Sequence, residues 1–382
     1  MRILQVVGGL AEGWGSPSKV VRELSGALAQ RGHDVEIRTT DVAPAGARLD
    51  VPLDRPVRDE QGFAIRFYRC DRPHPPYPSL RLLRAIWRDA EAWDVVHVHG
   101  LFSIPTSMTL VALRTKATTP YVVRTCGMLD PYSLSQRRRL KTAYFRTLER
   151  SNLNGAARIH VSTPLEQQAV QALELTPPIC VIPQGVEPPA KAVGATPIRP
   201  YVLFLSRIAR KKGLELLVRA FDRLAAERPA LDLVIAGPDE RGHRATIEGL
   251  AQRLGLTHRV RFPGFVRGQQ KADLLGHAAA FALSSYDENF GIVVVEAVQA
   301  GTPVVVSNKL GLAATVAEHG AGEVVGLDVE SIADGLRTVL SRGKQHYRAG
   351  LTAMGQSFEW GLAAERVAQM YRRVVAEHSA RR

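Results

Sequence analysis

Residues 284–307 read SSYDENFGIVVVEAVQAGTPVVVS. The two serines close a short apolar stretch, and a polar loop with Asp287, Glu288 and Asn289 follows. A helical pattern then begins near Gly291 and ends at Gly301, after which Pro303 restarts an extended segment. A buried strand, a loop, an apolar helix and a second buried strand in this order predict a parallel sheet covered by helices on both faces.

The same alternation extends over the whole chain. RILQVVGGL (2–10) leads through a glycine-rich loop into a helical segment that puts Val20, Val21, Leu24 and Leu28 on one face and stops at Gly32. Further short apolar runs are predicted as buried strands, namely DVEIRTT (34–40), WDVVHVHGLF (93–102), PYVVRTCG (120–127), ARIHVST (157–163), YVLFLS (201–206), LDLVIAG (231–237), RVRFPG (259–264), AAAFALSS (278–285), TPVVVS (302–307) and GEVVG (322–326).

A composition break divides the chain. Seven prolines fall between residues 177 and 200, so no regular element spans this stretch, and we expect a linker at 187–199. The sequence therefore predicts two doubly wound, Rossmann-like α/β domains, 1–186 and 200–361, with ligands in the cleft between them at the carboxyl ends of the strands. The last segment, 362–382, is predicted to be an amphipathic helix with a basic end.

Composition narrows the class of protein. The 382 residues carry a formal charge of +13, which favours anionic partners such as phosphates or an acidic membrane face. Three widely spaced cysteines provide neither a disulfide framework nor zinc-ligand spacing, and they fit a reducing compartment. The N-terminus lacks a signal-peptide pattern and no apolar run is long enough to span a bilayer, so we expect a soluble, cytoplasmic protein.

The loop and helix at 287–296 carry the clearest chemical signal. Free N–H groups of Phe290, Gly291 and Ile292 at the helix start would favour a phosphate. Glu296 accepts two parallel hydrogen bonds and so suits a ribose diol, whereas Glu288, nearer the loop tip, suits sugar hydroxyls. Two solvated glutamates are the alternative, but Glu296 lies among valines in a helix apolar enough to be buried, where an unpaired carboxylate is costly.

Two further loops follow strands. In YVLFLSRIARKKG (201–213), Arg207 and Lys212 flank a turn, and a guanidinium with an ammonium can hold a diphosphate; a solvated basic loop is the alternative. The loop GGLAEGWGSPSKVV (8–21) has neither dinucleotide-fingerprint nor P-loop spacing. Its Gly15 and Ser16 would present amides to a phosphate, or the loop is an ordinary tight turn.

Histidines and arginines complete the candidates. His97 and His99 share one face of a predicted strand; His99 ends the strand and should reach the cleft, and His97 is interpreted as a core histidine. After Asp130 and Pro131 we expect one long helix whose cations include Arg137. That helix could bind a membrane surface or the phosphate of an acceptor, and the alternative is an ordinary solvated basic helix face.

Together these segments resemble the retaining family 4 glycosyltransferases of the GT-B fold. The resemblance rests on ENFGIVVVE with AGTPVV, on SRIARKKG, and on VVHVHGLF, RTCGMLDP and VIPQGV. It implies that Glu296 binds the ribose, Glu288 the donor sugar, and Arg207 and Lys212 the diphosphate, with His99 beside the reacting sugar. His99, Arg207, Lys212 and Glu288 are the implied catalytic group.

The resemblance also implies the rest of the site and the reaction. The donor site would include Gly15, Ser16, Gly237, Phe265, Val266, Asn289, Phe290, Gly291 and Ile292, and the acceptor side Arg124, Asp130 and Arg137. The helix 362–382 would pack back on the first domain. A sugar would pass, with retention and without a metal or other cofactor, from a nucleoside-diphosphate sugar to a glycan or polyprenyl-linked acceptor.

RTCGMLDP resembles enzymes of bacterial surface-polysaccharide synthesis, which implies a peripheral position on the inner face of the cell membrane with an anionic membrane surface as partner. Two positions depart from the family pattern: Ser16 stands where many members have glycine, and Gln184 where they have asparagine.

Other functions stay open at this point. A nucleotide-sugar epimerase or a phosphorylase would keep the fold and change the reaction, and a non-catalytic two-domain binding protein would need neither the basic pair nor the two glutamates. Nucleic acid is not an expected partner, because the basic residues lack interleaved aromatics and any recognition motif. The sequence leaves the base, the sugar and the acceptor undetermined.

Overall fold

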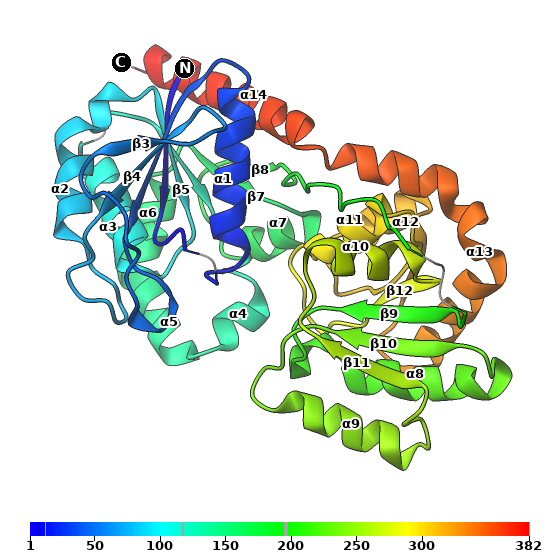
Figure 1. Cartoon of the computed structure of the whole chain (residues 1–382). Helices are drawn as coiled ribbons and strands as arrows, with labels where there is room; N and C mark the ends of the chain where they lie inside the picture. Colours follow the sequence, from blue (N-terminus) through cyan, green and yellow to red (C-terminus); the bar gives the residue numbers. More distant parts are fainter. Residues whose placement is uncertain (12, 117, 195–197, 382) are drawn as a thin grey trace. The chain divides into compact units, whose positions relative to one another are not determined.

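The computed structural model describes residues 1–11, 13–116, 118–194 and 198–381. The chain divides into two compact units, unit 1 with Met1–Gly185 and Trp360–Arg382, and unit 2 with Val186–Glu359 (Figure 1). The expected linker at 187–199 falls within unit 2, and its residues 195–197 lie outside the described part of the chain. Both units have the predicted doubly wound α/β architecture.

Unit 1 is built on an eight-stranded sheet in the order β3-β4-β2-β1-β5-β6-β7-β8. Its strands are β1 (Arg2–Val7), β2 (Asp34–Thr40), β3 (Pro56–Arg58), β4 (Ala64–Tyr68), β5 (Val95–His99), β6 (Tyr121–Arg124), β7 (Arg158–Val161) and β8 (Ile179–Val181). One edge departs from the predicted parallel sheet, because β3 pairs antiparallel with β4. All three residues of β3 are exposed, so no apolar run marks this hairpin in the sequence.

Helices cover both faces of this sheet. They are α1 (Ser16–Ala29), α2 (Leu80–Asp89), α3 (Ile104–Lys116), α4 (Pro131–Ser135), α5 (Arg138–Tyr144), α6 (Arg150–Asn154), α7 (Pro164–Gln171) and α14 (Trp360–Ala380). Ile3 and Val7 of β1 pack in one core with α1 and α14, whereas Leu4 and Val6 pack in the other with α2 and α3. This is the period-two alternation of a strand buried on both sides. Figure 1 shows α14 beside α1 on the first of these faces.

The basic segment after Pro131 is not the single long helix that the sequence predicts. It consists of α4, α5, a π-helical turn over Phe145–Glu149, and α6. Arg137 separates α4 from α5 with a left-handed backbone, φ +53°. A residue with a left-handed backbone interrupts the hydrogen bonds of a right-handed helix. Arginine is not a residue type that favours this conformation, so the sequence does not predict the break.

Unit 2 has a six-stranded, fully parallel sheet in the order β11-β10-β9-β12-β13-β14. Its strands are β9 (Tyr201–Leu205), β10 (Asp232–Ala236), β11 (Val260–Gly264), β12 (Ala280–Leu283), β13 (Val304–Ser307) and β14 (Gly322–Val325), and its α-helices are α8 (Leu214–Glu227), α9 (His243–Arg253), α10 (Gly268–His277), α11 (Ile292–Gln299), α12 (Ala313–His319) and α13 (Val329–Ser357). In Figure 1, α8 and α9 lie on one face of the sheet and α10 and α11 on the other. One continuous apolar core joins the layers.

Candidate functional site

Strand order places the candidate residues of unit 2 together. β9 lies between β10 and β12, so the chain leaves β9 and β12 toward opposite sides of the sheet. Open parallel sheets bind ligands at the carboxyl edge where the strand order reverses in this way. The loop that carries Arg207 and Lys212 follows β9, and the loop that carries Glu288 follows β12. The side chains that are candidates for binding phosphate and sugar therefore lie on the two sides of this switch point.

The loop after β9 holds its two cations differently. The Arg207 side chain is 55% exposed and pairs with Glu240, whereas Lys212 is buried and its ammonium pairs with Glu288. Burial lowers the pKa of Lys212, and the Glu288 carboxylate opposes that shift. A short 3-10 helix, Arg210–Lys212, leads into Gly213 with φ +62°. A β-carbon on Gly213 would collide with the Ser284 carbonyl oxygen, so glycine allows these two loops to touch.

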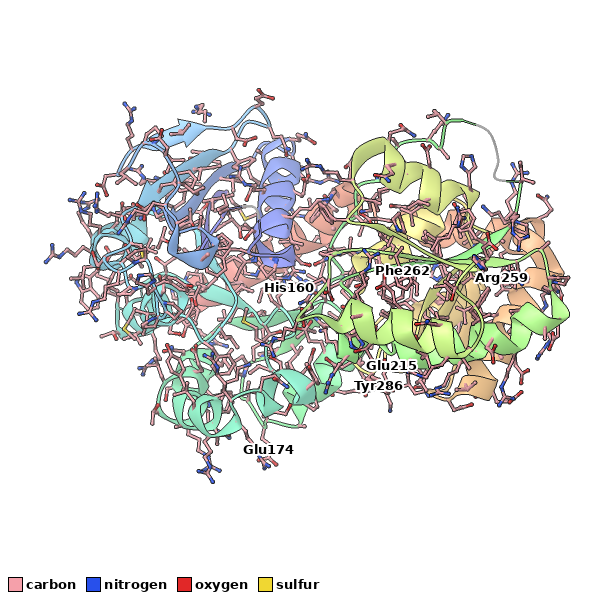
Figure 2. All side chains as sticks on the ribbon, turned by 60° about the horizontal axis from the view of Figure 1, so that its bottom comes forward. His160, Glu174, Glu215, Arg259, Phe262 and Tyr286 are labelled. Atoms are coloured by element: carbon pink, nitrogen blue, oxygen red, sulfur yellow. The ribbon has the colours of Figure 1, made fainter. Side chains whose placement is uncertain are left out.

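Main-chain bonds fix the loop after β12. The amide of Tyr286, labelled in Figure 2, donates to the Lys211 carbonyl at 2.9 Å, and the Glu288 carbonyl accepts from the Gly311 amide at 2.8 Å. Gly291 caps α11 with φ +78°, and a β-carbon there would lie 2.7 Å from a Leu310 methyl group. Val294 N–H to Gly291 C=O is a 2.8 Å bond of the first turn, so the Gly291 and Ile292 amides precede the helical ladder.

Glu296 is buried, as the apolar helix predicts, and it is paired. Its carboxylate lies 2.6 Å from the ammonium of Lys271, which α10 supplies. Lys271 was missed in the sequence, where GQQKAD resembles any solvated helix start. Nearby, the side-chain oxygen of Asn289 is buried without a partner among the described residues. A buried acceptor of this kind is expected where a ligand binds or a water is held.

The other donor-side candidates occupy the carboxyl ends of β10 and β11. Gly237 has φ +139°, and a β-carbon there would collide with the Ser206 carbonyl oxygen. Phe265 is 66% exposed, while the neighbouring Val266 is buried. An exposed phenyl ring at this edge can stack on a flat ligand, and Val266 belongs to the core.

In unit 1 the candidates cluster at the corresponding switch point, between β1 and β5. Gly15 caps α1 with φ +86° and no side-chain cap, and Ser16 is the first residue of that helix. The α1 N-terminus thus leaves amides available, although Glu12 of the same loop lies outside the described residues. The predicted helix face is confirmed, since Val20, Val21, Leu24 and Leu28 are all buried.

The strand histidines are both buried. His99 is 2% exposed, and its Nε2 lies 2.6 Å from Gln5 Oε1. His97 contacts the Tyr371 hydroxyl through Nδ1 at 2.7 Å, which confirms the interpretation of a core histidine. Burial, reinforced by the charge of Arg124, lowers the pKa of both residues well below the usual value, so both imidazoles are neutral. The Nδ1 atom of His99 is buried without a partner among the described residues.

The acceptor-side candidates differ in exposure. Arg124 is buried and donates to Ser162 Oγ at 2.9 Å and to Gln184 Oε1 at 2.6 Å, which gives Gln184 a structural task. Asp130 is buried at the start of α4, whereas Arg137 is exposed. A cavity of about 500 Å³ opens on α5, lined by Arg138, Arg139, Thr142, Ala143 and Arg146. None of the helices in the described ranges is long and apolar enough to cross a membrane.

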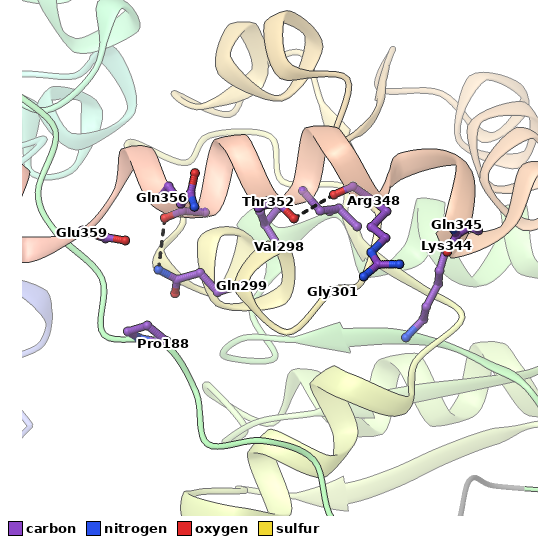
Figure 3. A pocket seen from close by; sticks show the side chains of 12 residues that line it. Pro188, Val298, Gln299, Gly301, Lys344, Gln345, Arg348, Thr352, Gln356 and Glu359 are labelled. Atoms are coloured by element: carbon purple, nitrogen blue, oxygen red, sulfur yellow. Dashed lines mark hydrogen bonds between the residues drawn. The ribbon is translucent and has the colours of Figure 1, made fainter.

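A second cavity of about 500 Å³ lies in unit 2 between the end of α11 and α13 (Figure 3). Lys344 and Arg348 line it from α13, and Gln299 from α11. Burial lowers the pKa of Lys344 to about 8, and its ammonium donates to the Gly276 carbonyl at 2.6 Å. The residues of the switch point do not line this cavity. In the described ranges, no group of three or more His, Cys, Asp or Glu side chains could hold a metal ion.

Comparisons with known proteins show the family of the chain. A family model described as glycosyl transferases group 1 matches residues 191–353, and one described as a glycosyl transferase 4-like domain matches residues 15–185. The chain belongs to the family 4 glycosyltransferases. Among the relatives of this glycosyltransferase is a D-inositol 3-phosphate glycosyltransferase of Kineococcus radiotolerans, 29% identical over 96% of this chain and 92% of the relative.

Solved structures share the GT-B fold of this glycosyltransferase. Sucrose-phosphate synthase from Thermosynechococcus elongatus superimposes with a TM-score of 0.75 at 22% identity, over 98% of this chain and 99% of the other. Anabaena HepE in complex with UDP-glucose gives a TM-score of 0.69 at 18% identity, over 96% and 98% of the two chains. At such identities the likeness shows the fold.

Proposed function

We propose that this glycosyltransferase moves a sugar, with retention of configuration, from a nucleoside-diphosphate sugar to a hydroxyl group of a glycan or polyprenyl-linked acceptor. The single observation that carries the proposal is the charge arrangement at the switch point of unit 2. There, Lys212 pairs with Glu288 of the loop after β12, Arg207 lies in the same loop as Lys212 and pairs with Glu240, and the Gly291 and Ile292 amides lie where the Glu288 loop enters α11.

Each group has a task in this reaction. The leaving group is a diphosphate, so the barrier falls when positive charge and N–H donors already surround the developing negative charge. Lys212, Arg207 and the Gly291 and Ile292 amides supply these without a metal ion. Glu296 would accept both ribose hydroxyls, and Glu288 would accept a hydroxyl of the donor sugar.

The ion pairs suggest how the site is prepared for its ligand. Lys212 neutralises the half-buried Glu288, and Lys271 neutralises the buried Glu296, so neither carboxylate is left unpaired before the substrate binds. A bound diphosphate would share Lys212 with Glu288. Ribose hydroxyls would share Glu296 with Lys271. His99, as a neutral imidazole, would position a sugar hydroxyl rather than act as a strong base, and the leaving phosphate would take the proton of the acceptor.

The likeness to HepE in complex with UDP-glucose supports a nucleotide-sugar donor. The relatives named D-inositol 3-phosphate glycosyltransferases favour an acceptor that carries a phosphate. The arginine-lined cavity on α5 has the charge to bind such a group. A role in cell-surface polysaccharide synthesis at the inner face of the membrane, with α5 on anionic lipid, is part of the same proposal.

A transfer assay tests the proposal. UDP-glucose, GDP-mannose and ADP-glucose are each incubated with the protein, with and without D-inositol 3-phosphate, and proton NMR follows the anomeric signals. A new glycoside with the anomeric configuration of its donor supports retaining transfer. An inverted product contradicts retention, and conversion of the donor into another nucleotide sugar without an acceptor favours an epimerase.

A further inference from the structure

Five polar side chains form an unbroken hydrogen-bonded row inside unit 1. Gln5 of β1, His97 and His99 of β5, and His160 of β7 lie beneath α14, whose Tyr371 reaches down to the sheet. All five are 2% exposed or less. His160 is labelled in Figure 2. Buried polar groups need hydrogen-bond partners within the protein, and each partner here has a known donor or acceptor capacity, so the direction of each hydrogen bond can be worked out.

The row has one fixed end. His160 Nε2 lies 2.8 Å from the Ile182 carbonyl oxygen, which can only accept, so this nitrogen carries the proton and His160 Nδ1 carries none. His97 Nε2, at 3.4 Å from that bare nitrogen, must then be the donor. His97 Nδ1 is therefore an acceptor, and the Tyr371 hydroxyl donates to it at 2.7 Å.

The remaining links follow in the same direction. Because the Tyr371 proton is committed to His97, its oxygen accepts from Gln5 Nε2 at 3.2 Å. The Gln5 amide oxygen must then face His99, and it accepts from His99 Nε2 at 2.6 Å. A flipped Gln5 would draw the Tyr371 proton to its own oxygen and leave the Tyr371 oxygen and His97 Nδ1 as two facing acceptors. The row thus excludes the flipped amide.

We propose that Tyr371 of α14 is a positioning residue that acts through Gln5 to hold His99 as the Nε2–H tautomer, with Nδ1 left as a bare acceptor for a hydroxyl of the sugar substrate. The inference rests on the proposed function only in naming the sugar. The protonation state itself follows from the hydrogen-bonded row.

Two observations agree with this assignment. His99 Nδ1 is the nitrogen that the row leaves bare, and it is also a buried atom without a partner in the described part of the chain. Burial and the nearby Arg124 lower the pKa of all three histidines, that of His160 to about 3, so each imidazole carries a single proton. A neutral histidine with one proton placed by its neighbour has only one nitrogen left to accept.

Nitrogen-15 NMR of histidine-labelled protein without ligand tests the tautomer directly. Protonated and bare ring nitrogens resonate far apart, and loss of the peak set in His99→Gln assigns His99. Wild type should show His99 with a proton at Nε2 and none at Nδ1. Tyr371→Phe frees the Gln5 amide to rotate and should lower the Nε2–H to Nδ1–H ratio by about tenfold, the scale of one buried hydrogen bond.

Tyr121→Phe is the matched control, because Tyr121 is buried in the same unit and its hydroxyl donates to the Asn152 carbonyl at 2.7 Å. It should leave the His99 peaks unchanged. Should Tyr371→Phe fail to fold, Gln5→Leu removes the same link from the other side. A wild-type His99 with its proton at Nδ1, or His99 peaks that are equal in wild type and Tyr371→Phe, would overturn the proposal. Neither result depends on nucleotide binding, so the proposed function is tested separately.

Discussion

Lys212→Met separates the stability of the buried ion pair from its role toward the substrate. The Lys212 side chain is 6% exposed and that of Glu288 18%. Methionine fills much of the lysine's volume and removes the ammonium, so the Glu288 carboxylate loses its neutralising partner. Glu288→Gln removes the opposite charge, and the double variant removes both. The three variants form a double-mutant cycle around one contact.

The structure sets the expected magnitudes. Breaking a buried pair from one side costs about 3–5 kcal/mol, but water reaches part of Glu288, so we expect a loss of about 2 kcal/mol for Lys212→Met. For a unit of this size that corresponds to a fall in Tm of roughly 4–8 °C. The double variant leaves no uncompensated charge and should lie within about 1 kcal/mol of wild type.

Substrate binding should follow a different pattern. UDP at about 100 times its Kd stabilises a protein by about 2.7 kcal/mol. A charge-assisted contact worth about 1.5–3 kcal/mol is lost with Lys212, so the same UDP concentration should add only about 0.3–1.3 kcal/mol in Lys212→Met and in the double variant. Thermal unfolding with and without UDP measures both effects. Full stabilisation by UDP in the double variant would refute the assignment of Lys212 to the diphosphate.

Three further predictions concern other parts of the site and fold. Arg207→Ala removes an exposed side chain, so the unfolding free energy should change by less than about 0.5 kcal/mol while UDP affinity falls at least about tenfold. Calorimetric titration with UDP measures the affinity, and Glu240→Ala, which removes the ion-pair partner of Arg207, is the control. Gly237→Ala should destabilise unit 2 by more than about 1 kcal/mol, because the new methyl group meets the Ser206 carbonyl; an unchanged urea midpoint would contradict the close approach. The lowered pKa values of His97, His99 and His160 mean that the unfolded chain binds protons below about pH 6.5 that the folded chain does not. The unfolding free energy should therefore be highest above about pH 6.5. Below that pH it should decrease by up to about 1.4 kcal/mol per pH unit for each histidine. Urea unfolding at pH 7, 6 and 5 measures how the unfolding free energy depends on pH. This dependence should be weaker in His160→Gln, and an unfolding free energy that does not change with pH would contradict the prediction.

The sequence was sufficient to predict the two doubly wound sheets, because their strands are apolar runs bounded by small or polar residues. It also predicted that Glu296 is buried and that a helix begins near Gly291. These features depend on local periodicity and on conformations that one residue type adopts readily.

Other features depend on contacts between distant segments and were missed. Lys271 pairs with Glu296 from another helix, and Tyr371 reaches Gln5 across 366 positions of the chain. The left-handed Arg137 that divides the basic segment has no local signal, since arginine normally continues a helix. Burial of His99 at 2% exposure likewise depends on packing by α14, which strand periodicity cannot predict.

The central claim is that the carboxyl edge of unit 2 binds a nucleoside diphosphate through Glu296, Arg207 and Lys212. Thermal unfolding with UDP, GDP and ADP in parallel, on wild type and Glu296→Ala, tests it most directly. Glu227→Ala is the control, because Glu227 ends α8 in the same unit and pairs with Arg337 at 2.8 Å. We predict that one nucleotide stabilises wild type and Glu227→Ala but not Glu296→Ala. Equal stabilisation of all three proteins, or none by any nucleotide, would contradict the account.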